Sequence, residues 1–384
     1  MNPVTNVQQA QMNPNIRSLL PIRDLIPSRR GRRTGKVHYI DLFTGAGGMH
    51  QGFRNVKGFK TITGVEMNKT AIRSFERNFP NDSILQKNVC EFLDEMENDK
   101  AARAALGIVE LLHGSPPCCG FSTANRNGGK NDESNNNLSL EWIRAIRIFD
   151  PLVATFENVD GMWRGKHIHY LRYILKQLML MGYQFHMDVL KACDYGDPQR
   201  RRRLIIIASK KHIPLPPLPV PTHSTHDSGL IPYVTVGDVL EGMSFNKRDP
   251  YDGLRVLPKK KSSPDDSNRK QDDVDVPPNK RTKHNHLNND YITLDWNDVA
   301  PALRASGPPV MHPLHDRPLT VKEYAALMSF PPNFKVCKDK RGSVASQYRQ
   351  IGNAVPVNLA TAIARSVMSV LEFNWKEPCI EIDD

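Results

Sequence analysis

The sequence predicts an α/β protein built on a doubly wound, mostly parallel sheet and accompanied by a second, smaller domain. Apolar, β-rich runs alternate with helical stretches between residues 37 and 209. Repeated βα units of this kind form a parallel sheet with helices on its faces. A glycine-rich turn follows the first run, and the alternation stops over residues 210–316. The region without alternation is therefore expected to form the smaller domain.

The elements of the larger domain are expected to follow one another along the chain. Its first strand, residues 37–42, ends at a turn that contains Gly45, Gly47 and Gly48 and leads into a helical stretch. Further strands are expected at 61–65, 83–86, 108–113, 152–156, 183–190 and 204–208. Further helices are expected at 71–79, 94–106, 138–149 and 167–181, and again at 320–328 and 357–371. Within 210–316, the β-like run is Tyr233–Val236.

Shifts in composition divide the rest of the chain. Residues 1–36 are expected to be a flexible basic arm, because seven Lys and Arg residues stand there against one acid, Asp24. The low-complexity insert at about 258–289 cannot bury enough apolar surface to fold alone. Residues 317–375 are expected to return to the larger domain, and residues 376–384 to form a tail.

Charge and cysteine usage limit the class of protein. The formal net charge of +11 favours a polyanionic partner, most often nucleic acid. The six cysteines lack the spacing of metal ligands, so no metal site and reduced thiols are expected. No apolar run approaches the length of a membrane span, and the N-terminus has no apolar signal core. A membrane protein or a secreted protein is therefore not expected.

Two places in the larger domain have residues suited to chemistry. The 108–113 strand runs into Gly-Ser-Pro-Pro-Cys-Cys-Gly-Phe-Ser (114–122), where two prolines end the strand and leave Cys118 at its carboxyl end. Open α/β sheets bind their ligands at this end of the strands. The glycine turn offers backbone amides, and Glu66 ends the second strand, where such folds bind ribose hydroxyls. These features predict a nucleoside-type cofactor near Cys118.

The order of the motifs resembles that of the cytosine-5 DNA methyltransferases, over roughly residues 37–209 and 295–372. The matching blocks are Phe43-x-Gly45-x-Gly47, Glu66, Pro116-Pro117-Cys118 with Phe121-Ser122, Glu157-Asn158-Val159, Gln199-x-Arg201-x-Arg203, Arg317 to Glu323, and Gly352 to Pro356. The resemblance implies a Rossmann-like catalytic and cofactor-binding domain at 37–209. It also implies a target-recognition region at 210–316 and a C-terminal part that folds back beside the cofactor.

The resemblance also implies a mechanism. Carbon 5 of cytosine is a poor nucleophile until a thiolate adds to carbon 6 and forms a covalent adduct, a role that falls to Cys118. A protonated carboxyl at ring N3, assigned to Glu157, neutralises the charge that this addition creates. Arg201 and Arg203 would position the base, with Arg203 at the cytosine carbonyl. The target base must leave the duplex for any of these contacts to form.

The implied cofactor is S-adenosyl-L-methionine, and the implied product is S-adenosyl-L-homocysteine. The residues expected to contact it are Phe43, Thr44, Gly45, Gly47, Glu66, Asn88, Pro117, Leu138, Asn353 and Val355. Double-stranded DNA is the expected partner, with contacts from Ser122, Arg126 and Gln199 and a lid formed by residues 119–137. Two departures from the family pattern are Asn88, where an acid is usual, and Cys119, where glutamine is common.

Several alternatives stay open at this level. Transfer-RNA members of the family share the central motifs, although their Cys-Phe-Thr tripeptide is absent here. A non-catalytic module that binds DNA or cofactor would be expected to have lost Cys118, Glu157 or the arginines. The enzyme could belong to a restriction–modification pair or act at CG sites in a eukaryote. Two basic clusters, 259–261 and 280–283, resemble a bipartite nuclear signal, so a nuclear location is expected, or the cytoplasm for a prokaryotic protein.

Overall fold

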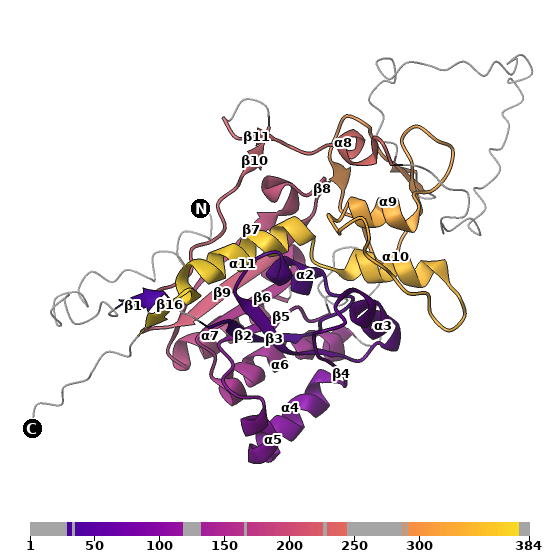
Figure 1. Ribbon diagram of the computed structural model, residues 1–384. Coiled ribbons are helices and arrows are strands. Elements are labelled where there is room, and N and C mark those ends of the chain that lie inside the picture. The colour runs from indigo at the N-terminus through magenta and orange to yellow at the C-terminus, as the bar shows by residue number, and fades with distance from the viewer. Residues whose placement is uncertain are drawn as a thin grey trace, which may run out of the picture.

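The computed structural model describes residues 29–32, 35–117, 132–164, 167–225, 229–243, 287–288 and 291–375 of the 384-residue chain. Figure 1 shows a layered body around one large sheet, with a smaller group of helices and short strands beside it. The expected insert at 258–289 lies almost entirely outside the described residues, and so does the expected tail at 376–384.

The large sheet has seven strands. Their spatial order is β4 (Ile84–Gln86), β3 (Phe59–Glu66), β2 (Val37–Leu42), β5 (Leu111–Gly114), β6 (Val153–Val159), β9 (Arg202–Lys210) and β7 (Tyr183–Lys191). The first five strands run parallel, and β9 lies antiparallel to both of its neighbours. The mostly parallel sheet predicted from the sequence is confirmed. The strand order reverses between β2 and β5, and ligands bind outside the carboxyl ends of the strands at such a point.

Helices cover both faces of this sheet (Figure 1). On one face, α2 (Gly48–Arg54) and α11 (Val357–Leu371) bury apolar side chains such as Phe53 and Ile363 against β2, β5 and β9. On the other face lie α4 (Val89–Asn98), α6 (Asp132–Phe149) and α7 (Ile168–Leu180), with Phe92, Trp142 and Ile174 in a second core. The strands are apolar on both faces because each face is covered.

A third core belongs to the smaller unit. It is built by α8 (Val236–Leu240), α9 (Val321–Ala326), α10 (Val344–Asn353) and the short strands β14 (Ala300–Pro301) and β15 (Val310–Met311). Strand β13 (Tyr291–Thr293) pairs with β15. Leu240, Tyr324 and Ile351 meet in this core. The helices at 321–353 therefore pack with the 236–311 region, and α11 is the C-terminal helix that packs on the large sheet.

Some elements differ from their expected form. The expected helix at 94–106 is divided between α4 and α5 (Lys100–Ala105), because the Asp99 side chain accepts from the amides of Ala101 and Ala102 and starts a new helix. Tyr233–Val236 is not a strand: it leads into α8. Residues 344–353 form α10, which was not expected. Within the expected arm, β1 (Arg29–Arg32) pairs with β16 (Phe373–Trp375).

The remaining short elements connect these layers. They are α3 (Lys69–Asn78), the 3-10 helices η3 (Asp160–Trp163) and η5 (Ala192–Tyr195), and the strands β8 (Gln199–Arg200), β10 (His223–Ser224), β11 (Ile231–Pro232) and β12 (Leu287–Asn288). Among the described residues, one helical stretch, Val344–Leu371, has the length and apolarity of a membrane span. Because 67% of its most apolar window lies buried inside the protein, it also fits a core helix.

Candidate active site

The turn after β2 has the backbone shape that a close-fitting ligand site requires. Phe43, Gly45 and Gly47 all adopt positive φ, at 60°, 59° and 98°. The buried Thr44 hydroxyl fixes the turn, since it donates to the Asp41 carbonyl at 2.7 Å and accepts from the Val65 amide at 3.1 Å. A Cβ on Gly45 would meet no heavy atom within 4 Å. The turn therefore leaves open space at Gly45.

Glu66 closes one side of this turn. One carboxylate oxygen accepts from the Gly45 amide at 2.9 Å, and the other accepts from the Asn68 amide at 2.7 Å. Each oxygen has a second lone pair, so the carboxylate can still accept from a ligand hydroxyl. Asn88 lies just after the neighbouring strand β4 and caps α4, with its side-chain oxygen 2.9 Å from the Cys90 amide.

The C-terminal segment reaches the same turn from the other side. A Cβ on Gly48 would stand 2.7 Å from the Val355 carbonyl oxygen, so glycine is needed for this close approach. Val355 is buried, whereas Asn353 is exposed at the end of α10. Leu138 lies on α6 and is half-buried. The structure thus brings the glycine turn, Glu66 and Val355 together at the carboxyl edge of the sheet.

The exit of β5 lies beside this turn. The Ser115 amide donates to the Leu42 carbonyl at 3.3 Å, and the Ser115 hydroxyl donates to the Phe43 carbonyl at 3.5 Å. On the other side, the Asn158 side chain donates to the Pro116 carbonyl at 3.4 Å. Pro117 is half-buried and is the last described residue of this segment. The expected nucleophile Cys118, the expected DNA contacts Ser122 and Arg126, and Cys119 lie outside the described residues.

Glu157 and Arg203 form a close pair at the same edge. The Arg203 Nε lies 2.6 Å from a carboxylate oxygen of Glu157, and the two side chains are 12% and 10% exposed. The pairing follows from strand register, since β6 and β9 are antiparallel and Val159 stands opposite Arg203. Two residues that were predicted as catalytic are therefore neighbours in the structure.

Gln199 and Arg201 lie in a different environment. The Gln199 side chain is fully buried and donates to the Leu327 carbonyl at 2.8 Å. Arg201 is 3% exposed, and its guanidinium donates to the carbonyls of Leu303, Gly352 and Ala354 at 2.6, 2.8 and 3.1 Å. These contacts connect Gln199 to the end of α9, and they connect Arg201 to Leu303 of the smaller unit and to the end of α10. They differ from the DNA contact expected of Gln199 and the base contact expected of Arg201.

Asp41 was missed as a site residue. It is fully buried near the end of β2, and neither carboxyl oxygen has a hydrogen-bond partner among the described residues. Burial raises the pKa of Asp41 well above its usual value, and the nearby negative charge of Glu66 raises it further. The sequence contained a sign of this role, because Asp41 is a charged residue inside an otherwise apolar strand. Burying such a residue is costly unless it is paired or hydrogen-bonded.

The residues around the turn fit S-adenosylmethionine. The open space at Gly45 can admit a ligand, Glu66 can accept from ribose hydroxyls, and the buried carboxyl of Asp41 lies close enough to Glu66 for their charges to interact. His113, opposite Asp41 on β5, is equally buried; its Nδ1 lies 2.9 Å from the Thr155 hydroxyl, and burial lowers the pKa of His113 to about 3. Among the described ranges, no cluster of three potential metal ligands occurs.

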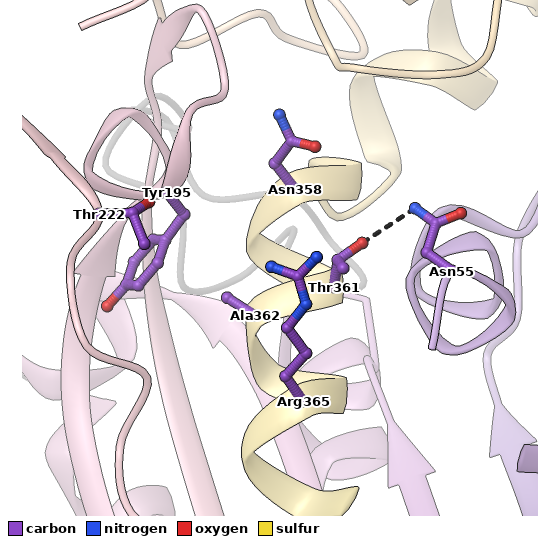
Figure 2. A pocket seen from close by; sticks show the side chains of 7 residues that line it. All are labelled: Asn55, Tyr195, Thr222, Asn358, Thr361, Ala362 and Arg365. Carbon is purple, nitrogen blue, oxygen red and sulfur yellow. Dashed lines mark hydrogen bonds between the residues drawn. The ribbon is translucent and has the colours of Figure 1, made fainter. Parts of the chain in front are cut away.

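Two surface cavities lie on other parts of the protein. One, of about 330 Å³, lies over α11 and η5 and is lined by polar side chains that include Asn55, Asn358 and Arg365 (Figure 2). The other, of about 510 Å³, is lined by Lys191, Arg200 and Arg202 together with hydroxyl side chains and Asp298. None of the predicted catalytic or cofactor residues lines either cavity.

Comparisons with known proteins identify the family of this chain. The C-5 cytosine-specific DNA methylase family matches residues 37–369. M.XorII of Xanthomonas oryzae pv. oryzae, a Type II methyltransferase, is 31% identical over an alignment 382 residues long, gaps included; the alignment covers 88% of this chain and 86% of the relative. M.AplI of Arthrospira platensis, also a Type II methyltransferase, is 32% identical over 344 residues, with 88% of each chain covered.

Solved structures share the fold. A candidate DNA modification methyltransferase encoded within an E. coli prophage superposes with a TM-score of 0.64 at 24% identity, covering 88% of this chain and 99% of the other. The methyltransferase EhMeth of Entamoeba histolytica gives a TM-score of 0.59 at 16% identity, with 88% and 99% covered. The family match over residues 37–369 and the relatives above 30% identity establish that this chain belongs to the C-5 cytosine-specific DNA methylases.

Proposed function

We propose that this cytosine-5 DNA methyltransferase modifies a specific sequence in double-stranded DNA, with S-adenosyl-L-methionine as methyl donor and S-adenosyl-L-homocysteine as product. The observation that carries the assignment is the Glu157–Arg203 pair, which lies at the carboxyl edge of the sheet. The Asn158 side chain joins this pair to Pro116, two residues before Cys118. The Type II relatives support a role in sequence-specific modification.

The chemistry divides among three residues. The Cys118 thiolate adds to carbon 6 of a flipped cytosine. After carbon 5 has gained the methyl group, a base removes the carbon-5 proton, and elimination of the thiolate restores the aromatic ring. Glu157 hydrogen-bonds ring N3, and Arg203, held 2.6 Å from Glu157, binds the cytosine carbonyl. The cofactor supplies an electrophilic methyl group for carbon 5. Arg201 and Gln199 act indirectly, because their buried side chains fix the segment on which Arg203 stands.

For the cofactor, we assign the turn Phe43–Gly47, Glu66 and the segment Asn353–Val355. Glu66 would accept from the ribose hydroxyls, and the buried Asp41 lies within the electrostatic influence of Glu66. Asn88 is engaged as the cap of α4, so its contact with an adenine would have to use the remaining capacity of its amide.

A second contact surface for DNA is suggested by the larger cavity. Residues 199–203 alternate as a strand does, so Arg200 and Arg202 point away from the side that Arg201 and Arg203 occupy. Lys191 stands directly opposite Arg202 in the β7–β9 register. Like charges in such a position destabilise a sheet. Asp160, 3.4 Å from the Arg202 Nε, offsets part of that repulsion, and a DNA phosphate bound beside Lys191 would offset more of it.

The comparisons give no support to the expected nuclear location, since the curated relatives reported above are bacterial. We propose the cytoplasm, where a bacterial modification enzyme meets its DNA, and treat the epigenetic role as unsupported.

The test is transfer of a labelled methyl group from S-adenosylmethionine to unmethylated duplex DNA, hemimethylated duplex DNA and transfer RNA. Label on duplex DNA that disappears in Cys118→Ala, with cofactor binding retained, is the expected result. Mapping the labelled cytosines then gives the recognised site. Label confined to transfer RNA would overturn the proposed DNA substrate. Label on DNA with Cys118→Ala would overturn the proposed role of Cys118 in the mechanism.

A further inference from the structure

A buried carboxylate joins the arginine segment to the start of α11. Asp197, between η5 and β8, is fully buried. One oxygen accepts from the Asn358 amide at 3.2 Å, and the other accepts from the Leu359 amide at 2.9 Å. These are amides of the first turn of α11, whose own preceding residue, Pro356, provides no side-chain cap. Asp197 therefore caps a helix that begins about 160 residues later in the chain.

Two further side chains complete the junction. The Ser329 hydroxyl donates to the Asp197 carboxylate. The Asn358 side chain donates to the Gly196 carbonyl at 2.9 Å and to the Ser329 hydroxyl oxygen at 3.2 Å. Figure 2 shows Asn358 at the start of α11, across the smaller cavity from Tyr195 of η5. The carboxylate thus binds three donors from two separate segments.

The junction holds the stretch that precedes α11 from both sides. Arg201, four residues after Asp197, donates to the carbonyls of Gly352 and Ala354. Asp197 fixes residues 358 and 359, immediately beyond that stretch. Between these anchors lie Asn353 and Val355, and Val355 packs against Gly48 beside the glycine turn. A change at Asp197 can therefore move the residues proposed to bind the cofactor.

We propose that Asp197 is a positioning residue whose ionised carboxylate fixes the first turn of α11 and thereby holds the 353–355 segment in the form that binds S-adenosylmethionine. The inference rests on the cofactor assignment of the proposed function. It predicts that cofactor affinity follows the ionisation of a residue that touches neither cofactor nor DNA.

The ionisation occurs in an accessible pH range. Burial raises the pKa of Asp197 to about 7, although hydrogen bonds from Ser329, Leu359 and Asn358 and the charge of Arg201 act in the opposite direction. Arg201 is the charged group that acts on it among the described residues. The protonated carboxyl carries a hydrogen on one oxygen, whereas the groups around it are donors. That oxygen then accepts less well, so the hydrogen bonds to the first turn of α11 are weakened. Cofactor binding should therefore favour the ionised form and weaken as pH falls through 7.

The experiment is calorimetric titration with S-adenosylhomocysteine between pH 6 and 8.5. For the wild type, the Kd is expected to fall several-fold from pH 6 to pH 8, by up to about tenfold per unit. Asp197→Asn should bind more weakly at pH 8 and lose this dependence. Ser329→Ala removes a donor that lowers the pKa of Asp197, so the midpoint should move to higher pH. A merely structural role for Ser329 would weaken binding without moving the midpoint.

Asp238→Asn is the matched control, because Asp238 belongs to the capping box of α8 and its carboxylate hydrogen-bonds Thr235 within that cap. Its pH profile should match the wild type, and proton changes on the ligand itself are common to every variant. Parallel profiles for the wild type, Asp197→Asn and Ser329→Ala would overturn the inference and leave the proposed function intact. Absence of binding by the wild type at every pH would remove both.

Discussion

The contact between Glu157 and Arg203 allows a direct test of one proposed catalytic side chain. The pair is nearly buried, with the Arg203 Nε and a Glu157 carboxylate oxygen 2.6 Å apart. Glu157→Gln keeps the shape and a hydrogen-bonding group but replaces the carboxyl by an amide. We expect kcat to fall by about 10²–10⁴, with little change in the affinity for cofactor. Single-turnover methyl transfer at saturating DNA measures this, and a variant with wild-type kcat would contradict the role of Glu157.

Gly45 offers a matched test of the cofactor turn. Gly45 and Gly107 both have positive φ, at 59° and 73°, and a Cβ would meet open space at either position. Alanine at each should therefore introduce a similar backbone strain of about 1–2 kcal/mol. Gly45→Ala should in addition weaken cofactor binding, because its methyl group enters the proposed pocket. Gly107, which precedes β5 at the opposite edge of the sheet, is the control. Equal cofactor Kd values for the two variants would remove Gly45 from the pocket.

Helix α9 begins with a capping box formed by Thr320 and Glu323. The Thr320 hydroxyl accepts from the Glu323 amide at 3.2 Å, and the Glu323 carboxylate accepts from the Thr320 amide at 2.7 Å and from Arg317. Thr320→Ala should lower the free energy of unfolding by about 1 kcal/mol, and Thr320→Ser should restore most of it. Chemical denaturation measures both values. Equal stability of the alanine variant and the wild type would contradict the importance of the cap.

The junction at the start of α11 should also appear in the pH dependence of stability. The pKa of Asp197 is raised to about 7 in the folded protein, above the ordinary carboxyl value of 3.8. Between these values the folded state binds more protons than the unfolded state, so this group makes the free energy of unfolding fall as pH rises from about 4 to 7. Asp41 acts in the same direction, because its pKa is also raised by burial. The quantity to measure is therefore the difference between wild type and Asp197→Asn in the change of Tm with pH. A slope unchanged by the substitution would contradict the shift.

Elements with a strong local pattern were predictable, and elements fixed by distant contacts were not. The strand 37–42 and the helix 357–371 lie where the sequence predicts them, because each has a continuous apolar pattern. Helix α10 was missed, since its pattern is interrupted by polar residues such as Gln347 and Gln350. In the fold these side chains are buried and bind the carbonyls of Val336 and Cys337. Tyr233–Val236 has a β-like composition, but the Thr235 cap starts α8 there.

We expect the affinity for DNA to depend on which edge of the large sheet carries the positive charges. Lys191 and Lys211 are both exposed, but Lys191 lies beside Arg202 at the carboxyl edge of the sheet and Lys211 follows β9 at the opposite edge. Lys191→Gln should weaken DNA binding and reduce the slope of log K against log salt by about 0.9, the value for one lost phosphate contact. Lys211→Gln makes the same change in net charge and should leave the slope unaltered. Fluorescence anisotropy with duplex DNA across a salt series distinguishes the two variants, and equal slopes would exclude a phosphate at the larger cavity.

The sequence alone determined the α/β class, the order of the strands along the chain and the chemical type of the site, because these depend on local pattern and on motifs a few residues long. The resemblance placed Glu157 and Arg203 at two atoms of the same base, and the antiparallel pairing of β6 with β9 accounts for their direct contact. Only the tertiary structure separated the accessible Arg203 from the buried Arg201, two residues away in the same motif. It alone brought Asp197 to the start of α11. Burial, and contacts between residues 100 or more positions apart in the chain, arise only when the chain is packed. A local sequence pattern therefore cannot predict them.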